Sequence, residues 1–209
     1  MIELWTAATG NGQKASIMME ESGLDYTVHA LDMRAGDYKK PEFLSVSPIG
    51  KIPVIRDSEG LDGTPVTVCE ALAIVFYLAE KSQTLRPRDG LEQVKILQWA
   101  SLIASGFGPA FSYKVRFELF APEKSPFALQ LFTQEAHRYY KIMEAQLSST
   151  DYLIGPDYTL ADVLAYPVAA SSAKMLEGGL EPYPHIRRWR DVVALRPAVQ
   201  RGMKVPAMG

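Results

Sequence analysis

The chain has few of the residues that build disulfides and metal centres. It contains a single cysteine, Cys69, and three histidines, His29, His137 and His185. One cysteine cannot form an internal disulfide or a thiolate metal cluster, and the histidines lack the short spacings that bring metal ligands together. We therefore expect no metal, and we interpret Cys69 as a thiol buried at a strand end rather than a redox cysteine.

The chain also lacks an excess of either charge and any long apolar run. Its 22 basic and 24 acidic residues give a formal net charge of -2, which offers no electrostatic attraction to nucleic acid or to anionic membranes. No apolar run reaches the ~18 residues of a membrane span, and residues 1–5 lack the basic and apolar regions of a signal peptide. The composition, with 47% hydrophobic residues, is that of an ordinary globular protein, and we expect it in the cytoplasm.

The first part of the chain alternates strand and helix patterns. In order, they predict a strand over residues 2–5, a helix over 13–22, a strand over 26–31, a short helix over 41–47, strands over 53–55 and 65–69, and a helix over 70–81. A helix that joins two strands favours a parallel, right-handed pair. Only a turn separates the last two strands, so these should be antiparallel.

After residue 82 the strand patterns end. Residues 83–90 are a turn-rich linker, and helical patterns follow over residues 91–119, 126–147, 159–175, 185–195 and 197–203. Residues 106–109 could interrupt the first of these helices. Thr159 and Asp162 have the spacing of a capping box at the start of the third. The sequence therefore predicts an α/β domain over residues 1–82, with the order βαβ-α-ββα, and an all-α domain over residues 91–209.

Residues 47–55, with the sequence Ser-Pro-Ile-Gly-Lys-Ile-Pro-Val-Ile, are the focus of the first domain. Pro53 precedes an apolar strand, and proline belongs at strand starts and edges because it cannot donate to a ladder. If the Ile52-Pro53 bond is cis, the backbone groups of Ile52 face outward and could pair with an extended, peptide-like ligand. Spacing alone favours the alternative, an ordinary trans proline at a loop-strand junction, because cis is only ~5–6% of X-Pro bonds.

Several motifs taken together resemble the cytosolic glutathione transferase family, and particularly its bacterial Nu-like class, which includes glutathione-dependent disulfide-bond oxidoreductases. They occupy residues 9–14, 41–44, 47–53, 70, 73–81, 97–99, 106–109 and 158–162. The resemblance covers nearly the whole chain. It implies a thioredoxin-like N-terminal domain, an all-helical C-terminal domain, a cis bond before Pro53, and a homodimer. It also implies glutathione as co-substrate and a small hydrophobic electrophile or disulfide as the second substrate.

By this resemblance, residues of the first domain bind the glutathione backbone. Ile52 would pair with it as an added strand, and Lys51 would supply a cation for the glycyl carboxylate. Glu70 would pair with the ligand ammonium, while the helix that starts at Glu70-Ala71 would receive the γ-glutamyl carboxylate on its free N–H groups. The alternative for Glu70 is an acid that merely stabilises the first turn of a helix.

The same resemblance assigns the glutathione thiolate to Thr9 and Asn11. A free thiol titrates near ~8.5 and only the thiolate is nucleophilic, so the protein must stabilise the anion. No tyrosine or cysteine stands in this loop, which argues against the tyrosine-type and cysteine-type members. Alternatively, Thr9 and Asn11 are turn and capping residues.

The class also uses an arginine of the second domain, here Arg138, to reach glutathione, and a surface arginine is the alternative. The acceptor pocket would lie between the domains. Its expected walls are Ala8, Trp99, Ser105, Phe107, Tyr113 and Phe117.

The sequence departs from the family pattern at three places. Ala71 replaces a serine whose hydroxyl would bind the γ-glutamyl carboxylate, and losing a hydrogen bond to a charged group costs about 1.5–3 kcal/mol. Tyr38 replaces a glutamine near the glycyl end, and Ala8 and Gly10 replace the prolines that flank the threonine. These departures keep two other functions open: a non-catalytic binding or regulatory protein with this fold, and a lyase or isomerase that acts on glutathione adducts.

Overall fold

The structure, a computed structural model, describes residues 1–173, 175–176 and 178–207. The chain forms two compact units. The first contains Met1–Arg86 together with the segment from Ala194 onward, and the second contains Pro87–Val193. The sequence predicts one C-terminal domain over residues 91–209, whereas in the structure the final segment packs with the N-terminal residues.

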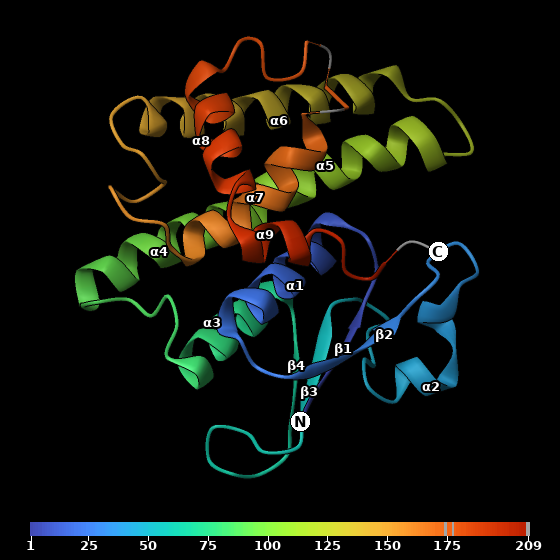
Figure 1. Cartoon of the computed structure of the whole chain (residues 1–209). Helices are drawn as coiled ribbons and strands as arrows, with labels where there is room; N and C mark the ends of the chain where they lie inside the picture. The colour runs from blue at the N-terminus through green and yellow to red at the C-terminus, as the bar shows by residue number, and fades with distance from the viewer. Residues whose placement is uncertain (174, 177, 208–209) are drawn as a thin grey trace. The chain divides into compact units, whose positions relative to one another are not determined.

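The first unit is a mixed sheet with helices on both faces (Figure 1). Its elements are β1 (Ile2–Thr6), α1 (Gly10–Ser22), β2 (Tyr26–Ala30), the short 3-10 helix η1 (Asp37–Lys39), α2 (Pro41–Leu44), β3 (Val54–Asp57), β4 (Val66–Cys69), α3 (Ala71–Ser82) and α9 (Pro197–Gly202). The sheet order is β2-β1-β3-β4. β1 and β2 are parallel, and β3 is antiparallel to both β1 and β4. This is the thioredoxin-like arrangement that the family resemblance implies.

The register brings three chain segments to one edge of the sheet. Trp5 of β1 lies opposite Val54 of β3, and Val54 lies opposite Cys69 of β4. The C-terminal ends of β1 and β4 and the N-terminal end of β3 therefore meet. We call this edge, which carries Thr6, Pro53 and Cys69, the proline edge.

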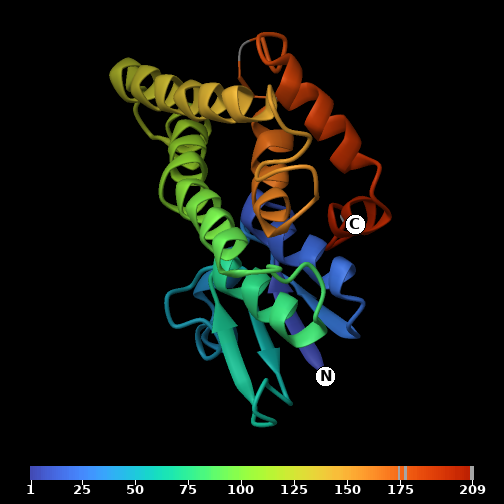
Figure 2. The same ribbon diagram turned by 90° about the vertical axis from the view of Figure 1, so that its left-hand side faces the viewer.

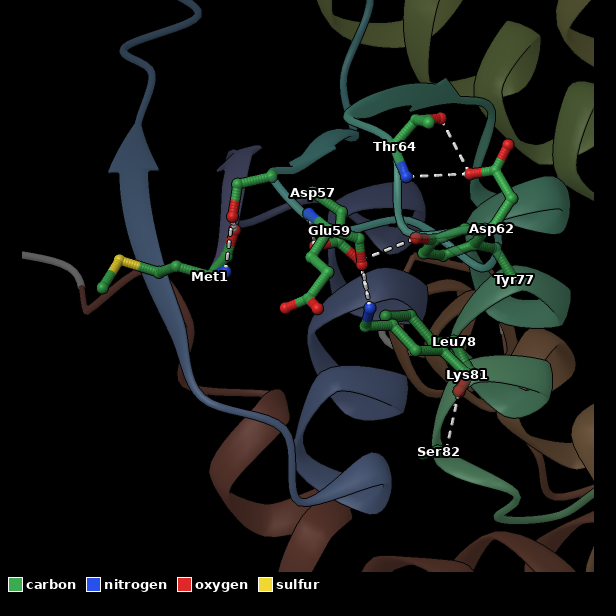
Figure 3. Close-up of polar contacts among 10 residues, drawn as sticks. Met1, Asp57, Glu59, Asp62, Thr64, Tyr77, Leu78, Lys81 and Ser82 are labelled. Carbon is green, nitrogen blue, oxygen red and sulfur yellow. Dashed lines mark hydrogen bonds and ion pairs between the residues drawn. The ribbon is translucent and has the colours of Figure 1, made fainter.

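At the opposite edge, the buried Asp57 ties α3 to the sheet (Figure 3). Its carboxylate accepts from the Tyr77 hydroxyl at 2.6 Å and from the Glu59 N–H at 3.0 Å, and it pairs with Lys81 at 2.8 Å. Burial works to raise the pKa of Asp57, but the bonds from Lys81, Tyr77 and Glu59 outweigh it and hold that pKa below its usual value. The carboxylate is therefore a charged anchor between the strand and the helix.

Helix α9 packs closely on α1, as Figure 1 also shows. A Cβ at Gly202 would lie 2.5 Å from the Cα of Ile17, so only glycine permits this approach. The side-chain amide of Gln13 donates to the carbonyl of Met203 at 3.2 Å. The C-terminal part of the described chain therefore covers one side of α1, the helix that begins at the proline edge.

The second unit is helical (Figure 2). Its elements are α4 (Gly90–Leu102), η2 (Ile103–Phe107), α5 (Gly108–Val115), η3 (Arg116–Phe120), α6 (Pro126–Leu147), α7 (Leu160–Ser172) and α8 (Pro184–Ala194), which extends one residue past the unit boundary. The helix runs from Gly90 to Phe120 without the break that residues 106–109 could have made. Instead η2 is a π-helical turn in which the Gly108 N–H reaches the Ile103 carbonyl, just before Pro109, which has no N–H to donate.

The capping box predicted at Thr159 and Asp162 begins α7. The buried carboxylate of Asp162 accepts from the backbone N–H groups of Thr159 at 2.9 Å and Leu153 at 3.1 Å, and from the indole of Trp189 at 2.8 Å. Burial raises the pKa of Asp162 to about 6 against the pull of these donors. The helix ends at Ser172, before the predicted end at residue 175.

Within the described ranges, no helix combines the length and the hydrophobicity needed to cross a membrane. The same residues contain no group of three or more histidine, cysteine, aspartate or glutamate side chains placed to bind a metal ion.

Candidate functional site

The loop before β3 presents an unpaired stretch of backbone at the proline edge. The Ile52-Pro53 bond is cis, as the family resemblance implies. The backbone N–H and C=O of Ile52 have no hydrogen-bond partner among the described residues. The buried Ser47 holds the loop, because its hydroxyl donates to the carbonyl of Lys51 at 2.9 Å and accepts from the Lys51 N–H at 3.2 Å. The Lys51 side chain is exposed.

Glu70 follows β4 at the same edge in an unusual backbone conformation. Its φ of 71° and ψ of 123° lie where residues other than glycine are rarely found, and such strain, on the order of 1–3 kcal/mol, is typical of functional sites. Glu70 is exposed and makes no side-chain cap to α3. The first turn of α3, beginning with the buried Ala71, therefore has N–H groups without a capping side chain, which is a suitable place for an anion.

Cys69, the residue before Glu70, is poorly suited to act as a nucleophile. The thiol is half-buried, and burial, with a smaller contribution from the Glu70 charge, raises the pKa of Cys69 above its ordinary value. A raised pKa disfavours the nucleophilic thiolate.

Thr9 caps α1 at the proline edge. It has an extended backbone, and its hydroxyl oxygen accepts from the Gly12 N–H at 3.2 Å, so the helix begins at Gly10, three residues before the predicted start. A hydroxyl has one proton and two lone pairs, so capping leaves its proton free to donate elsewhere. Capping and thiolate stabilisation are therefore compatible roles. Thr9 and Asn11 are both exposed.

Lys14 lies one turn further along α1, and the sequence predicts no role for it in the site. It is only 4% exposed, and its ammonium donates to Asn11 Oδ1 at 2.9 Å. Burial lowers the pKa of Lys14 to about 8, although the negative charge of Glu70 opposes the shift. One signal was available: Lys14 precedes the buried Ile17 and Met18 by three and four positions, which places it on the buried face of the helix.

Tyr38 and Arg138 are the other two residues that the family resemblance assigns to glutathione binding. Tyr38, in η1, packs beside the core cluster of Phe43, Val46 and Val54, and its carbonyl lies 2.9 Å from where a Cβ of Gly50 would be. It therefore adjoins the loop that carries Lys51.

Arg138 belongs to the second unit, on α6. It is exposed, pairs with Glu135 at 2.8 Å and lies over the ring of Tyr139. These contacts hold Arg138 on its own helix, and its contact with glutathione stays a prediction.

Both units match family models. Residues 11–81 match the N-terminal domain of glutathione S-transferases, and residues 106–197 match the C-terminal domain. The chain belongs to the glutathione S-transferase family.

Within the family, the chain is similar to proteins of the disulfide-bond oxidoreductase group. It is 33% identical to the disulfide-bond oxidoreductase YfcG of Escherichia coli, over 100% of this chain and 97% of that protein. Two solved structures are also similar. One is a glutathione transferase family member from Pseudomonas fluorescens with two glutathione molecules bound, with a TM-score of 0.93 and 34% identity over 98% of this chain and 93% of that one. The other is a glutathione transferase from Pseudomonas putida with one glutathione disulfide bound per subunit, with a TM-score of 0.92 and 31% identity over 98% and 91%.

Proposed function

We propose that the protein binds reduced glutathione at the proline edge and uses its thiolate to attack a small disulfide or a hydrophobic electrophile. One observation carries this proposal: the unpaired backbone of Ile52, the uncapped first turn of α3, and Thr9 with Asn11 are all placed at one edge of the sheet. A γ-glutamyl tripeptide thiol needs these three features, namely a strand partner, an anion site and donors to sulfur.

The ends of the ligand would be bound by charge. The exposed Glu70 carboxylate pairs with the α-ammonium, while the α-carboxylate beside it accepts from the first turn of α3 at Ala71. Lys51, with Tyr38 nearby, would attract the glycyl carboxylate at the other end. Arg138 is the further cation that the family resemblance assigns to glutathione. The central cysteinyl residue would pair with Ile52, next to Pro53. This pairing would point the sulfur towards the start of α1.

At the start of α1, the sulfur would meet two donors. The Thr9 hydroxyl proton, which capping does not use, and the Asn11 side-chain amide both stabilise a thiolate over a thiol. The positive end of the α1 dipole acts in the same direction. A lower thiol pKa increases the fraction of nucleophile at neutral pH.

For a disulfide substrate, the reaction needs two glutathione molecules and no protein cysteine. The bound thiolate attacks one sulfur of the substrate, forms a mixed disulfide and releases one substrate thiolate. A second glutathione thiolate attacks the glutathione sulfur of the mixed disulfide and releases the other substrate thiolate. The substrate gains two electrons, and the two glutathione molecules become glutathione disulfide. The similar structures with two glutathione molecules or glutathione disulfide support this stoichiometry.

A non-catalytic glutathione-binding or regulatory protein is the second candidate. Ala71 favours it, because alanine offers no hydroxyl to the ligand at the first position of α3.

Calorimetric titration with reduced and oxidised glutathione, followed by turnover assays with a dialkyl disulfide and a chlorinated nitroaromatic, separates these candidates. We expect the wild type to bind and to turn over one of the two substrates, and Thr9→Ala or Asn11→Ala to reduce turnover. Binding without any turnover would support the regulatory protein, and absence of binding would refute both.

We also propose that the protein is a cytoplasmic homodimer. The cytoplasmic glutathione pool is kept reduced, as the reaction requires, and two-fold dimers are the commonest oligomers. Helix α4 carries exposed apolar side chains at Leu91, Val94 and Leu97, which a second copy could cover. Sedimentation of the wild type against Val94→Lys tests this, and a wild-type monomer at micromolar concentration would contradict it.

A further inference from the structure

Lys14 is a buried cation for which the binding scheme above has no role. Its ammonium has three protons to donate, and within the part of the chain that the structure describes it has one acceptor, the neutral amide oxygen of Asn11 at 2.9 Å. Among the described residues, no carboxylate lies at ion-pair distance from it. A buried ammonium without an anion is costly, so its position next to an expected thiolate site calls for an explanation.

The polar groups that act on Lys14 come from its own helix and from the start of α3. On its own helix the neighbour is Asn11, and on α3 the charge that reaches it is Glu70. Arg201 of α9 contacts Glu20, and Arg196, the residue before α9, contacts Glu21, both at the other end of α1. On β1, Glu3 contacts His29 and Arg56. Lys14 therefore acts on Asn11 directly and on Glu70 through space.

The chemistry of the contact determines how the Asn11 amide is turned. An ammonium can only donate, so the Asn11 atom that faces Lys14 must be the carbonyl oxygen. The NH₂ group lies in the same plane as the oxygen but points to the opposite side of the Cβ–Cγ axis, away from Lys14. If the amide were turned over, its oxygen would face the ligand and repel a thiolate.

We infer that Lys14 is a positioning residue, which holds the Asn11 amide with its NH₂ group available to the glutathione sulfur. The inference rests on the proposed function, and it assigns to Lys14 an effect exerted through Asn11 on the ionisation of the bound thiol.

The protonation state of Lys14 limits the pH range over which it can orient the Asn11 amide. Above a pH of about 8 the amine loses its proton and can accept a hydrogen bond as well as donate one. The orientation of Asn11 is then no longer fixed. We expect the benefit of Lys14 to be present below this pH and to decline above it.

The test is the ultraviolet absorbance of the thiolate of bound glutathione, titrated against pH. In Lys14→Met, which keeps the length of the side chain, the pKa of the bound thiol should rise by about one unit, equivalent to ~tenfold less thiolate at neutral pH. The affinity for S-methylglutathione, which has no thiol, should be unchanged. Lys114→Met is the matched control: Lys114 is also 4% exposed but donates to Glu118 in the second unit, and its loss should leave the thiol pKa unaltered.

A double-mutant cycle identifies the route of the effect. In an Asn11→Ala background, Lys14→Met should add nothing further to the thiol pKa. Asn11→Asp keeps an acceptor for Lys14 but removes the NH₂ group, so it should raise the thiol pKa at least as much as Lys14→Met and provides a second variant should Lys14→Met fold poorly.

Each outcome has a definite meaning. If the wild type binds glutathione and the thiol pKa is the same in Lys14→Met, the inference is refuted while the proposed function stands. Effects of Lys14→Met and Asn11→Ala that simply add would also refute it, because Lys14 would then act independently. If the wild type does not bind glutathione, the proposed function fails and the inference fails with it.

Discussion

At the scale of single residues, Ala71 is where glutathione affinity can be changed most directly. It begins α3, whose first turn has no capping side chain. Ala71→Ser would add a hydroxyl donor beside the expected γ-glutamyl carboxylate, and a hydrogen bond to a charged group contributes about 1.5–3 kcal/mol. We expect glutathione affinity to rise by about tenfold or more in calorimetric titration. Ala145→Ser, an added hydroxyl at an exposed position of α6, should have no effect, and an equal gain there would contradict the assignment.

Asp57 makes the free energy of unfolding depend on pH in the acid range. Removing one partner of a buried ion pair costs about 3–5 kcal/mol, so Asp57→Ala should unfold at much lower urea concentration at neutral pH. Its folded pKa is held below the ordinary value of 3.8. The stabilisation is therefore complete above that value and disappears as the pH falls through the folded pKa.

The urea midpoints of wild type and Asp57→Ala should accordingly converge at acid pH. Tyr77→Phe, which removes one donor and keeps the charge, is the milder control, with an expected loss of about 1.5–3 kcal/mol. A gap between wild type and Asp57→Ala that stays constant down to strong acid would show that Asp57 does not ionise in this way.

At the scale of elements, α7 depends on one carboxylate that joins three segments. Asp162 accepts hydrogen bonds from Thr159, Leu153 and Trp189. Asp162→Ala leaves these buried donors without an acceptor, each at a cost of about 1–3 kcal/mol. We expect the second unit to lose its cooperative thermal transition. Thr159→Ala, which removes only the cap side chain, should cost about 1 kcal/mol, and similar losses for both variants would contradict the network.

The same elements show what the sequence can and cannot predict. Helix α6 has the predicted bounds, residues 126–147, because Pro126 marks its first turn and apolar residues recur along it. The π-helical turn before Pro109 was not predictable, because periodicity does not report how a helix accommodates a missing N–H donor. The parallel pair β1/β2 and the antiparallel pair β3/β4 follow from the pattern, whereas the pairing of β3 with β1 was not predicted from it and the cis bond at Pro53 came only from the family resemblance.

The site residues also divide into those that the sequence predicts and those that it does not. Thr9, Asn11 and Glu70 were reached through motifs, and their proximity follows from the sheet register, which no local pattern contains. Lys14 was missed because a lysine in a helix is normally a surface residue.

At the scale of the whole molecule, Gly202 controls whether α9 can reach α1. A Cβ there would lie 2.5 Å from the backbone of Ile17, so Gly202→Ala forces the helices apart and should cost about 1–3 kcal/mol, as overpacking does. The displacement should also weaken glutathione binding, because α1 carries Thr9 and Asn11. At Gly90 an added Cβ meets nothing, so Gly90→Ala should not lower the melting temperature. Equal effects of the two substitutions would refute the close approach.

The packing of α9 on α1 can form only late in the synthesis of the chain. Gln13 and Met203, which hydrogen-bond to each other, are 190 positions apart. A ribosome that adds ~5–20 residues per second needs on the order of 10–40 s to make the chain between them. For that interval the emerging sheet holds its future glutathione site with one side of α1 uncovered, and a chaperone that recognises apolar surface would find Ile17 accessible until the last helix has been made.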